Sequence, residues 1–417
     1  MARKIILEII VRYLRDGSYL NILLNDRLED PELSRKDKDL ITKVVYGTVQ
    51  NKLFLEYQLA PYLENKKVKT LPQAALLMSA YQICFLDKIP TYAIINEAVA
   101  LVSEKDRYAG KFVNAILRNF VRDGMRDVNA DSWQEELAIK TSHPNWMVSM
   151  LLKQYGEEET KKICVSNNDI PTRVARVNTL LASKQSILED DDFVAGYISE
   201  DAVLYKAGNI ANTDYFTLGK LTIQDESSQL VAKFLNPQKG ESVLDMCCAP
   251  GSKTTHLSAI MENTGTITAI DIFPHKITLV EENIKRMQAT NINCQVQDAT
   301  KLQEVFQQES FDRILLDAPC SGFGVLRRKP EIKYHDASAM DTIIPLQLKL
   351  LENAYYLLKN SGKMVYSTCT LNKKENTLMI QKFIKLFPDM QILEEKTILP
   401  YQYQSDGFYM CKLKKGR

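Results

Sequence analysis

The stretch SVLDMCCAPGSKTTHLSAIMENTGTITAID, residues 242–271, decides how the C-terminal half of this chain folds. It starts with a short apolar run that ends in an acid and turns at a Pro-Gly pair. Helix-forming residues follow, and a second apolar run ends in Asp271. Strands joined through a crossover helix run parallel to each other, so this stretch predicts one unit of a parallel sheet.

The same alternation continues downstream. Apolar runs at 293–298, 311–317 and 363–368 predict further strands, and 406–415 reads as a final strand. Helical periodicity covers 253–261, 276–287, 340–358 and 375–387 between and after them. From Gly240 onward the sequence therefore predicts a doubly wound, Rossmann-like α/β domain with a mostly parallel sheet.

The upstream half has a different pattern. From residue 4 to about 125 apolar residues recur every three or four positions, which predicts an all-helical domain. Short strand-like runs at 172–180, 193–199, 202–207 and 215–223, with a helical stretch at 183–190, indicate a small mixed α/β segment. We therefore predict three domains, at residues 1–128, 129–235 and 236–417.

Composition narrows the class of protein. The 417 residues carry a net charge of only +1, so any nucleic-acid binding must come from local basic patches such as RRK at 327–329. No apolar run is long enough for a membrane span, and charges interrupt the apolar N-terminal residues. Eight cysteines without a C-x-x-C pair, and only four histidines, indicate reduced thiols and no metal site. We expect a cytoplasmic protein without a membrane or metal partner.

Ligands of parallel sheets bind where the strands end. Gly251 allows close approach of a ligand to the first turn, and the following helix start offers free N–H groups. Asp271 and Asp298 end the second and third predicted strands, where carboxylates accept hydrogen bonds from ribose hydroxyls. These residues suggest an adenosine-type ligand, although each acid could equally be an ordinary helix cap.

Two thiols follow the next two predicted strands. DAPCSGFG at 317–324 places Asp317 and Cys320 after one strand, and YSTCTL at 366–371 places Cys369 after the next. A free cysteine is most often a small buried apolar residue. Two thiols beside an acid on one rim are also the groups that covalent catalysis uses.

The motifs DMCCAPGSKT, DAPCSGFG and YSTCTL, in this order, resemble those of the AdoMet-dependent RNA cytosine-5 methyltransferases. QDESSQLVA at 224–232 is similar to the segment that precedes the catalytic domain in that family. VVYGTVQN, NEAV and KFVNAILR resemble the NusB-like N-terminal domain of its RsmB (Fmu/Sun) branch. Nearly the whole chain is covered.

The resemblance implies roles that the residues alone leave open. It makes Cys369 the nucleophile that attacks cytosine C6, Cys320 the thiol that assists product release, and Asp317 a contact to the base and cofactor. It implies an AdoMet site formed by Cys247, Cys248, Ala249, Pro250, Gly251, Ser252, Lys253, Asp271, Asp298 and Asp317. Two positions depart from the usual C-A-A-P-G-G-K pattern: Cys248 and Ser252, both small, stand where the family commonly has Ala and Gly.

The implied substrate is small-subunit ribosomal RNA, with the target cytosine unpaired or flipped out, and the protein is expected to be a monomer. A tRNA cytosine-5 methyltransferase is the alternative within the same class. A non-catalytic, NusB-like RNA-binding assembly or antitermination factor is the alternative from another class. The presence of Asp317, Cys320 and Cys369 together argues against the latter.

Overall fold

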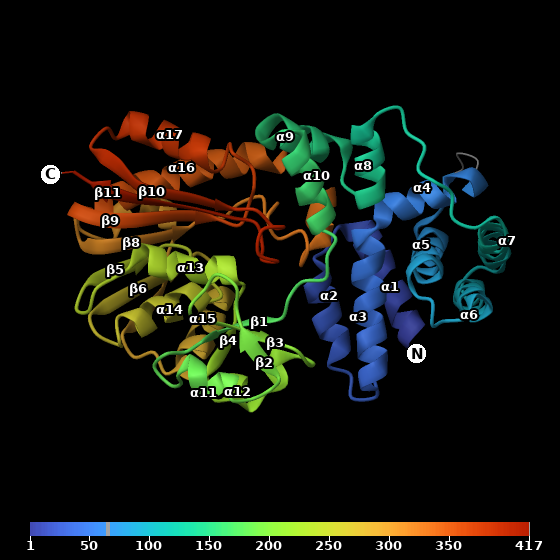
Figure 1. Ribbon diagram of the computed structural model, residues 1–417, viewed down its shortest axis with the longest axis horizontal. Coiled ribbons are helices and arrows are strands. Elements are labelled where there is room, and N and C mark those ends of the chain that lie inside the picture. Colours follow the sequence, from blue (N-terminus) through green and yellow to red (C-terminus); the bar gives the residue numbers. More distant parts are fainter. Residues whose placement is uncertain (64–66, 417) are drawn as a thin grey trace. The chain divides into compact units, whose positions relative to one another are not determined.

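The computed structural model describes residues 1–63 and 67–416, which form two compact units (Figure 1). The first unit comprises Met1–Asn168 together with Leu326–His335. The second comprises Asp169–Val325 and Asp336–Arg417, of which Arg417 is not described.

The first unit is helical, as the apolar periodicity predicted. Buried aliphatic residues from α1, α3, α5, α6 and α7 form one core, and side-chain caps such as Asp106, which accepts from the backbone N–H of Tyr108 and Ala109, start the helices. The helices are α1 (Ala2–Asp16), α2 (Leu20–Leu28), α3 (Arg35–Gln50), α4 (Lys52–Leu63), α5 (Thr70–Phe85), α6 (Thr91–Ser103), α7 (Arg107–Asp123), α8 (Trp133–Thr141), α9 (Asn145–Tyr155) and α10 (Glu157–Ser166).

A segment from far along the sequence completes this helical unit. Residues 326–335 contain the short 3₁₀ helix η3 (Pro330–Tyr334). Lys333 is fully buried, and its amine donates to the Gln50 and Thr141 carbonyl oxygens at 3.2 Å and to Asn168 Oδ1 at 2.7 Å. Burial lowers the pKa of Lys333 to about 7. Arg327, from the predicted RRK patch, is also buried and is therefore not available to a phosphate.

The second unit begins with a small antiparallel sheet in the order β2-β3-β1-β4. Its elements are β1 (Val174–Val177), α11 (Lys184–Leu188), β2 (Phe193–Ala195), β3 (Ala202–Tyr205), η1 (Ile210–Asn212), α12 (Asp214–Thr217) and β4 (Leu221–Ile223). The predicted strand at 215–223 was wrong over its first half. The Thr213 side chain accepts from the backbone N–H of Phe216 and starts a helical turn there.

A seven-stranded sheet forms the rest of the second unit, in the order β10-β11-β9-β8-β5-β6-β7. The five strands β7, β6, β5, β8 and β9 are parallel, whereas β11 and β10 join antiparallel at one edge. The bounds are α13 (Glu226–Leu235), β5 (Ser242–Asp245), α14 (Ser252–Ile260), β6 (Thr266–Asp271), α15 (Pro274–Met287), β7 (Ile292–Val296), η2 (Ala299–Glu304), β8 (Phe311–Asp317), α16 (Ala339–Leu357), β9 (Leu358–Thr368), α17 (Thr377–Leu386), β10 (Met390–Ile398) and β11 (Phe408–Lys415). The predicted mostly parallel sheet is confirmed.

Helices cover both faces of this sheet (Figure 1). Leu244, Ile314 and Leu316 pack with α16 and α17 on one face, while the alternate residues Val243 and Leu315 pack with α13 and α14 on the other. Because helices cover both faces of the sheet, successive side chains of its central strands are buried. This explains why the sequences of these strands are continuous apolar runs.

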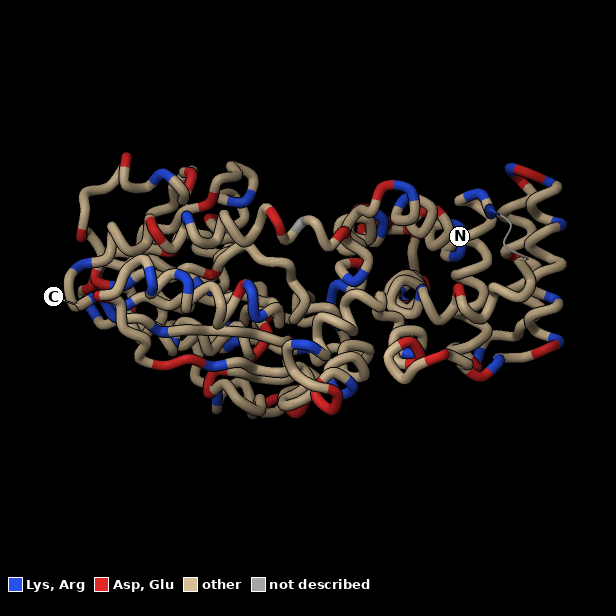
Figure 2. The backbone as a smooth tube through the Cα atoms, turned by 90° about the horizontal axis from the view of Figure 1, so that it is seen from above, with Lys and Arg blue, Asp and Glu red and all other residues tan. Residues whose placement is uncertain are grey.

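Lys and Arg are interspersed with Asp and Glu throughout the chain, in keeping with the net charge of +1 (Figure 2). In the described part of the chain, no helix is sufficiently long and apolar to span a bilayer.

Candidate active site

The two thiols predicted to share a rim lie side by side. Cys320 follows β8 and Cys369 follows β9, and these strands are neighbours in the parallel part of the sheet, with Asp317 paired to Ser367. Cys320 Sγ lies 3.4 Å from Cys369 Sγ. Both side chains are only partly buried, so the pair is accessible at the sheet edge.

Asp317 and Lys253 form an ion pair on the same rim. Lys253 Nζ lies 2.6 Å from Asp317 Oδ2, and the Ser367 hydroxyl donates to Asp317 Oδ1 at 2.7 Å. Burial opposes the charge on Lys253, but Asp317 and then Cys369 raise its pKa above the usual value. Lys253 therefore stays protonated at neutral pH and places a positive charge near Cys369.

The environment of Cys320 differs from that of Cys369. The hydrogen bond with Cys369, burial, the charge of Cys369 and the nearby Glu375 carboxylate together raise the pKa of Cys320 well above its usual value. Cys320 is therefore protonated at neutral pH. Cys369 interacts electrostatically with the Lys253 ammonium.

The loop between β5 and α14 is held on several sides. Cys248 N–H donates to the Ile270 carbonyl at 2.9 Å, and Asn283 Nδ2 donates to the Pro250 carbonyl at 2.9 Å. Gly251 has φ of +96°, and a Cβ there would lie 3.1 Å from Val280 Cγ1. The loop thus packs tightly against α15, and glycine is required at its turn.

A buried arginine from the small sheet supports the start of α14. Arg176 Nη2 donates to the Ser252 carbonyl at 3.2 Å and to Thr255 Oγ1 at 3.1 Å, and its Nε donates to Gln224 Oε1. Its side chain is fully buried, so the small sheet and this loop form one continuous structure.

The remaining predicted residues divide into buried and rim positions. Burial raises the pKa of Cys247 and Cys248, which therefore remain thiols, and Cys248 packs in an apolar cluster with Val280. Asp271 ends β6 and accepts from the backbone N–H of Phe273. Asp298 follows β7 and caps η2 by accepting from the Thr300 N–H. Ala249, Pro250, Gly251 and Ser252 form the turn itself.

Two buried acids were not among the predicted site residues, although Asp245 had been recognised as the acid that ends the first predicted strand. Asp245 ends β5, and its Oδ2 accepts from the Thr254 hydroxyl at 2.8 Å, while its buried Oδ1 has no partner among the described residues. Glu375 is fully buried beside the Cys320 loop. The strand-end position of Asp245 was the signal that the sequence offered, whereas Glu375 carries no such signal.

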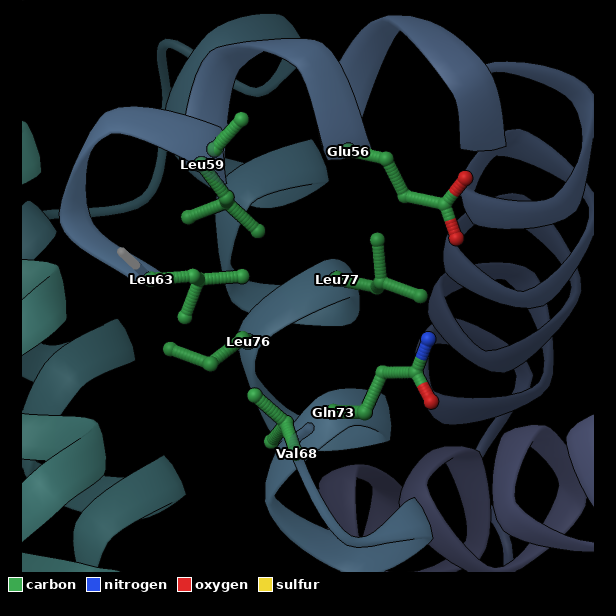
Figure 3. A pocket seen from close by; sticks show the side chains of 8 residues that line it. Glu56, Leu59, Leu63, Val68, Gln73, Leu76 and Leu77 are labelled. Atoms are coloured by element: carbon green, nitrogen blue, oxygen red, sulfur yellow. The ribbon is translucent and has the colours of Figure 1, made fainter. Parts of the chain in front are cut away.

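A pocket of about 310 Å³ lies in the helical unit, between α4 and α5 (Figure 3). Half of its lining residues are leucines, and none of the residues discussed above contributes to it. It is lined by Glu56, Leu59, Ala60, Leu63, Val68, Gln73, Leu76 and Leu77.

The sequence of this chain matches those of known proteins and protein families. Residues 232–414 match the family model described as 16S rRNA methyltransferase RsmB/F, residues 1–122 match the NusB family, and residues 143–190 match a ferredoxin-like domain of RsmF/B-like methyltransferases. A probable ribosomal RNA small subunit methyltransferase B from Bacillus subtilis is 39% identical to this chain, over 99% of this chain and 98% of that protein. This chain belongs to the RsmB family.

Other matches agree with that assignment. The ribosomal RNA small subunit methyltransferase B of Vibrio cholerae is 32% identical over 92% of this chain and 91% of that protein. The crystal structure of PH0851 superposes with a TM-score of 0.85 at 24% identity, over 100% of this chain and 99% of that one, which shows the shared fold. The predicted RsmB resemblance, the NusB-like helical region and the use of AdoMet are thereby confirmed.

The residues of this RsmB-family chain fit AdoMet. That molecule carries an ammonium, ribose hydroxyls and a sulfonium, all of which favour carboxylate neighbours. The unpartnered Asp245 Oδ1 is suited to a donor or cation, and Asp271 and Asp298 stand at the ends of the next two strands. Burial raises the pKa of Asp245 to about 7, with Asp317 contributing and Thr254 opposing. A bound cation would favour its ionised form.

Proposed function

We propose that this protein transfers a methyl group from AdoMet to C5 of a cytosine in 16S ribosomal RNA through a covalent adduct between Cys369 and cytosine C6. The observation that carries the proposal is the pair of thiols 3.4 Å apart, beside the Asp317–Lys253 ion pair, at the carboxyl edge of the sheet.

Cytosine C5 is a weak nucleophile, so the ring must be activated before it accepts a methyl group. In the proposed reaction the Cys369 thiolate adds to C6, and the C5=C6 electron pair moves to C5. AdoMet supplies the electrophilic methyl group that C5 then takes. A base removes the C5 proton, the S–C6 bond breaks, and the C5=C6 double bond is restored.

The unequal surroundings of the two thiols support the assignment of roles. The Lys253 ammonium favours a thiolate at Cys369, whereas the hydrogen bond with Cys369, burial and the Glu375 carboxylate favour a neutral thiol at Cys320. The residues alone left these roles open, and the family resemblance assigns them in the same sense. Cys369 is therefore proposed as the nucleophile and Cys320 as the thiol required for release.

Asp317 is proposed to contact the N3/N4 edge of the base. Its carboxylate is fixed by Lys253 and Ser367 and is still partly exposed, with 26% of the side chain accessible. A positioned carboxylate at that edge accepts hydrogen bonds from the base and so orients C6 toward the thiols as the adduct forms. A cytosine within a duplex cannot reach the thiols, so the target is a loop or flipped nucleotide.

The test combines two cysteine variants with radiolabelled AdoMet and unmodified small-subunit rRNA, followed by a denaturing protein gel. Cys320→Ala is expected to give a labelled, RNA-shifted band that Cys369→Ala and the wild type do not accumulate. A trapped adduct in Cys369→Ala would reverse the roles. Absence of 5-methylcytosine in rRNA, with activity on tRNA, would move the substrate to the alternative class of RNA.

The cellular setting is part of the proposal. We propose a cytoplasmic monomer in which residues 1–128 and 129–235 bind the RNA by shape and phosphate contacts and residues 236–417 carry the chemistry.

A further inference from the structure

A buried carboxylate lies directly behind the two thiols. Glu375 precedes α17 and is fully buried. Its Oε2 accepts from the Ser321 N–H at 2.9 Å and from Gln347 Nε2 at 3.1 Å. Its Oε1 accepts from the Ser321 hydroxyl at 2.6 Å and from Asn372 Nδ2 at 3.0 Å. All four partners donate, which is the arrangement that an ionised carboxylate satisfies.

These contacts fix the backbone on both sides of Cys320. Gln347 Nε2 donates to the Pro319 carbonyl at 2.9 Å, just before Cys320, and also to Glu375. The amide directly after Cys320 is held by Glu375 itself. The peptide units that flank this thiol are therefore both anchored to one pair of side chains.

The next residue holds the other thiol in the same way. Asn376 Nδ2 donates to the Thr370 carbonyl at 2.8 Å, and Asn376 Oδ1 accepts from the Thr368 hydroxyl at 2.6 Å. Thr368 and Thr370 flank Cys369. The two loops also touch directly, with 2.7 Å between the hydroxyl oxygens of Ser321 and Thr370.

We propose that Glu375 and Asn376 are positioning residues that set the separation of the two thiols, Glu375 by holding the loop of Cys320 and Asn376 by holding the loop of Cys369. This inference rests on the proposed function, in which both thiols must reach one cytosine ring in succession. Both side chains are buried, and we propose that they act through the two cysteine loops and not through contact with the substrate. Since displacement of a reacting group by about 1 Å is enough to cost roughly a hundredfold in rate, the dipeptide governs turnover rather than binding.

Glu375 also acts on Cys320 through its charge. Its carboxylate is one of the groups that raise the pKa of Cys320, after the hydrogen bond with Cys369 and burial. Replacement by glutamine removes that charge and presents an amide N–H₂ to neighbours that all donate, so at least one of the four hydrogen bonds is lost.

The experiment compares Glu375→Gln with the wild type, with Cys320→Ala, and with Glu394→Gln as a matched control. Glu394 is an exposed glutamate on β10 that pairs with Lys412. We expect Glu375→Gln to lower kcat about tenfold or more, to change KM for AdoMet less than about twofold, and to accumulate the covalent RNA adduct that Cys320→Ala accumulates. Glu394→Gln is expected to behave as the wild type.

Gln347→Met is a second variant, which removes the hydrogen bonds to the Pro319 carbonyl and to Glu375 and leaves Glu375 itself in place. Methionine has a similar length, and Gln347 Oε1 is buried without a partner among the described residues, so its loss leaves no new unsatisfied group of its own. We expect a smaller fall in kcat in the same direction, with the AdoMet-induced rise in melting temperature retained.

The outcomes separate this inference from the proposed function. If the wild type forms no 5-methylcytosine, the proposed function fails, whatever the variants do. If the wild type is active and Cys320→Ala traps an adduct, but Glu375→Gln and Gln347→Met keep wild-type kcat and trap none, the positioning role is overturned and the function stands. A loss confined to AdoMet binding and thermal stability would also overturn it, because it would show a purely structural role.

Discussion

Lys253 joins the loop between β5 and α14 to the rim that carries the two thiols. It lies in the first turn of α14, pairs with Asp317 at 2.6 Å, and its ammonium interacts with Cys369. Lys253 thus interacts with two other predicted site residues, Asp317 and Cys369. The consequence is that a change at Lys253 should alter the ionisation of Cys369, the proposed nucleophile, as well as the geometry of Asp317, the proposed base contact.

We predict that Lys253→Met lowers kcat/KM about tenfold or more at neutral pH and moves the acid limb of the pH–rate profile to higher pH. The sign follows because loss of a nearby cation disfavours the thiolate and so raises the thiol pKa. Lys239→Met, at an exposed lysine that pairs with Glu262, is the control and should be unaffected. A uniform fall in rate with an unchanged profile would contradict this role.

Asp245 leads to a prediction about stability. Its pKa is about 7 in the folded protein, against about 3.9 in an unfolded chain. The folded state therefore binds more protons between these values, and the contribution of Asp245 to stability is present below about pH 4 and is lost as the pH rises to about 7.

Asn at this position does not titrate. The melting temperature of Asp245→Asn, measured without AdoMet and relative to the wild type, is therefore expected to rise by several degrees between pH 4 and pH 7 and to stay level above that. Differential scanning fluorimetry across this range measures the difference directly. A difference that stays constant with pH would show that Asp245 is ionised throughout.

The rim that carries the two thiols was predictable from the sequence because its residues follow strands. Cys320, Cys369 and Asp317 each stand directly after an apolar run, and parallel strands bring their carboxyl ends to one edge. Glu375 and Asn376 were not predictable in this way. They lie at a helix start, and only the tertiary structure shows that their side chains turn back toward the two cysteine loops.

At the scale of elements, the loop after β8 is locked against the start of β11 by two glycines. Gly324 N–H donates to the Cys369 carbonyl at 2.9 Å, and Gly407 N–H donates to the Gly324 carbonyl at 2.8 Å. A Cβ on Gly324 would lie 1.9 Å from the Gly407 carbonyl oxygen and 2.8 Å from that of Cys369. Any side chain at residue 324 would therefore displace the backbone of the loop that follows β8.

Gly324→Ala is accordingly predicted to lower both the melting temperature and the rate of methyl transfer, the latter by about tenfold or more. Gly240→Ala provides the calibration. It also has a positive φ, +82°, but open space around it, and should cost only about 1 kcal/mol through backbone strain. Equal effects of the two substitutions on rate would show that close packing at Gly324 is unimportant for catalysis.

The elements were predicted well where both faces of a strand are buried and less well at the edge of the sheet. β10 was missed, because seven of its nine residues are exposed and its sequence, MQILEEKTI, neither alternates nor forms an apolar run. Its hydrogen bonds with β11 stabilise it as a strand despite that pattern. The boundaries predicted near residues 128 and 235 stay a prediction.

At the scale of the whole molecule, the chain leaves the second unit after Val325 and returns at Asp336. Residues 326–335 directly follow the loop that carries Cys320. Their side chains nevertheless form hydrogen bonds with the helical unit, as those of Lys333 and Tyr334 do. The sequence predicted neither this crossing nor the burial of Lys333, because KPEIKYH reads as an ordinary polar loop. Its local stability should therefore follow the helical unit.

Two matched core substitutions test that expectation by hydrogen exchange of the full-length protein. Leu117 in α7 and Leu244 in β5 are both fully buried, and Leu→Ala at such sites costs about 2–5 kcal/mol. Leu117→Ala is expected to speed exchange in residues 326–335 to the same extent as in α3 and to leave β8 unchanged. Leu244→Ala should speed exchange in β8 and leave 326–335 protected. If exchange in residues 326–335 instead changed together with exchange in β8 in both variants, the stability of this segment would depend on the seven-stranded sheet. The helical unit would then fold independently of residues 326–335.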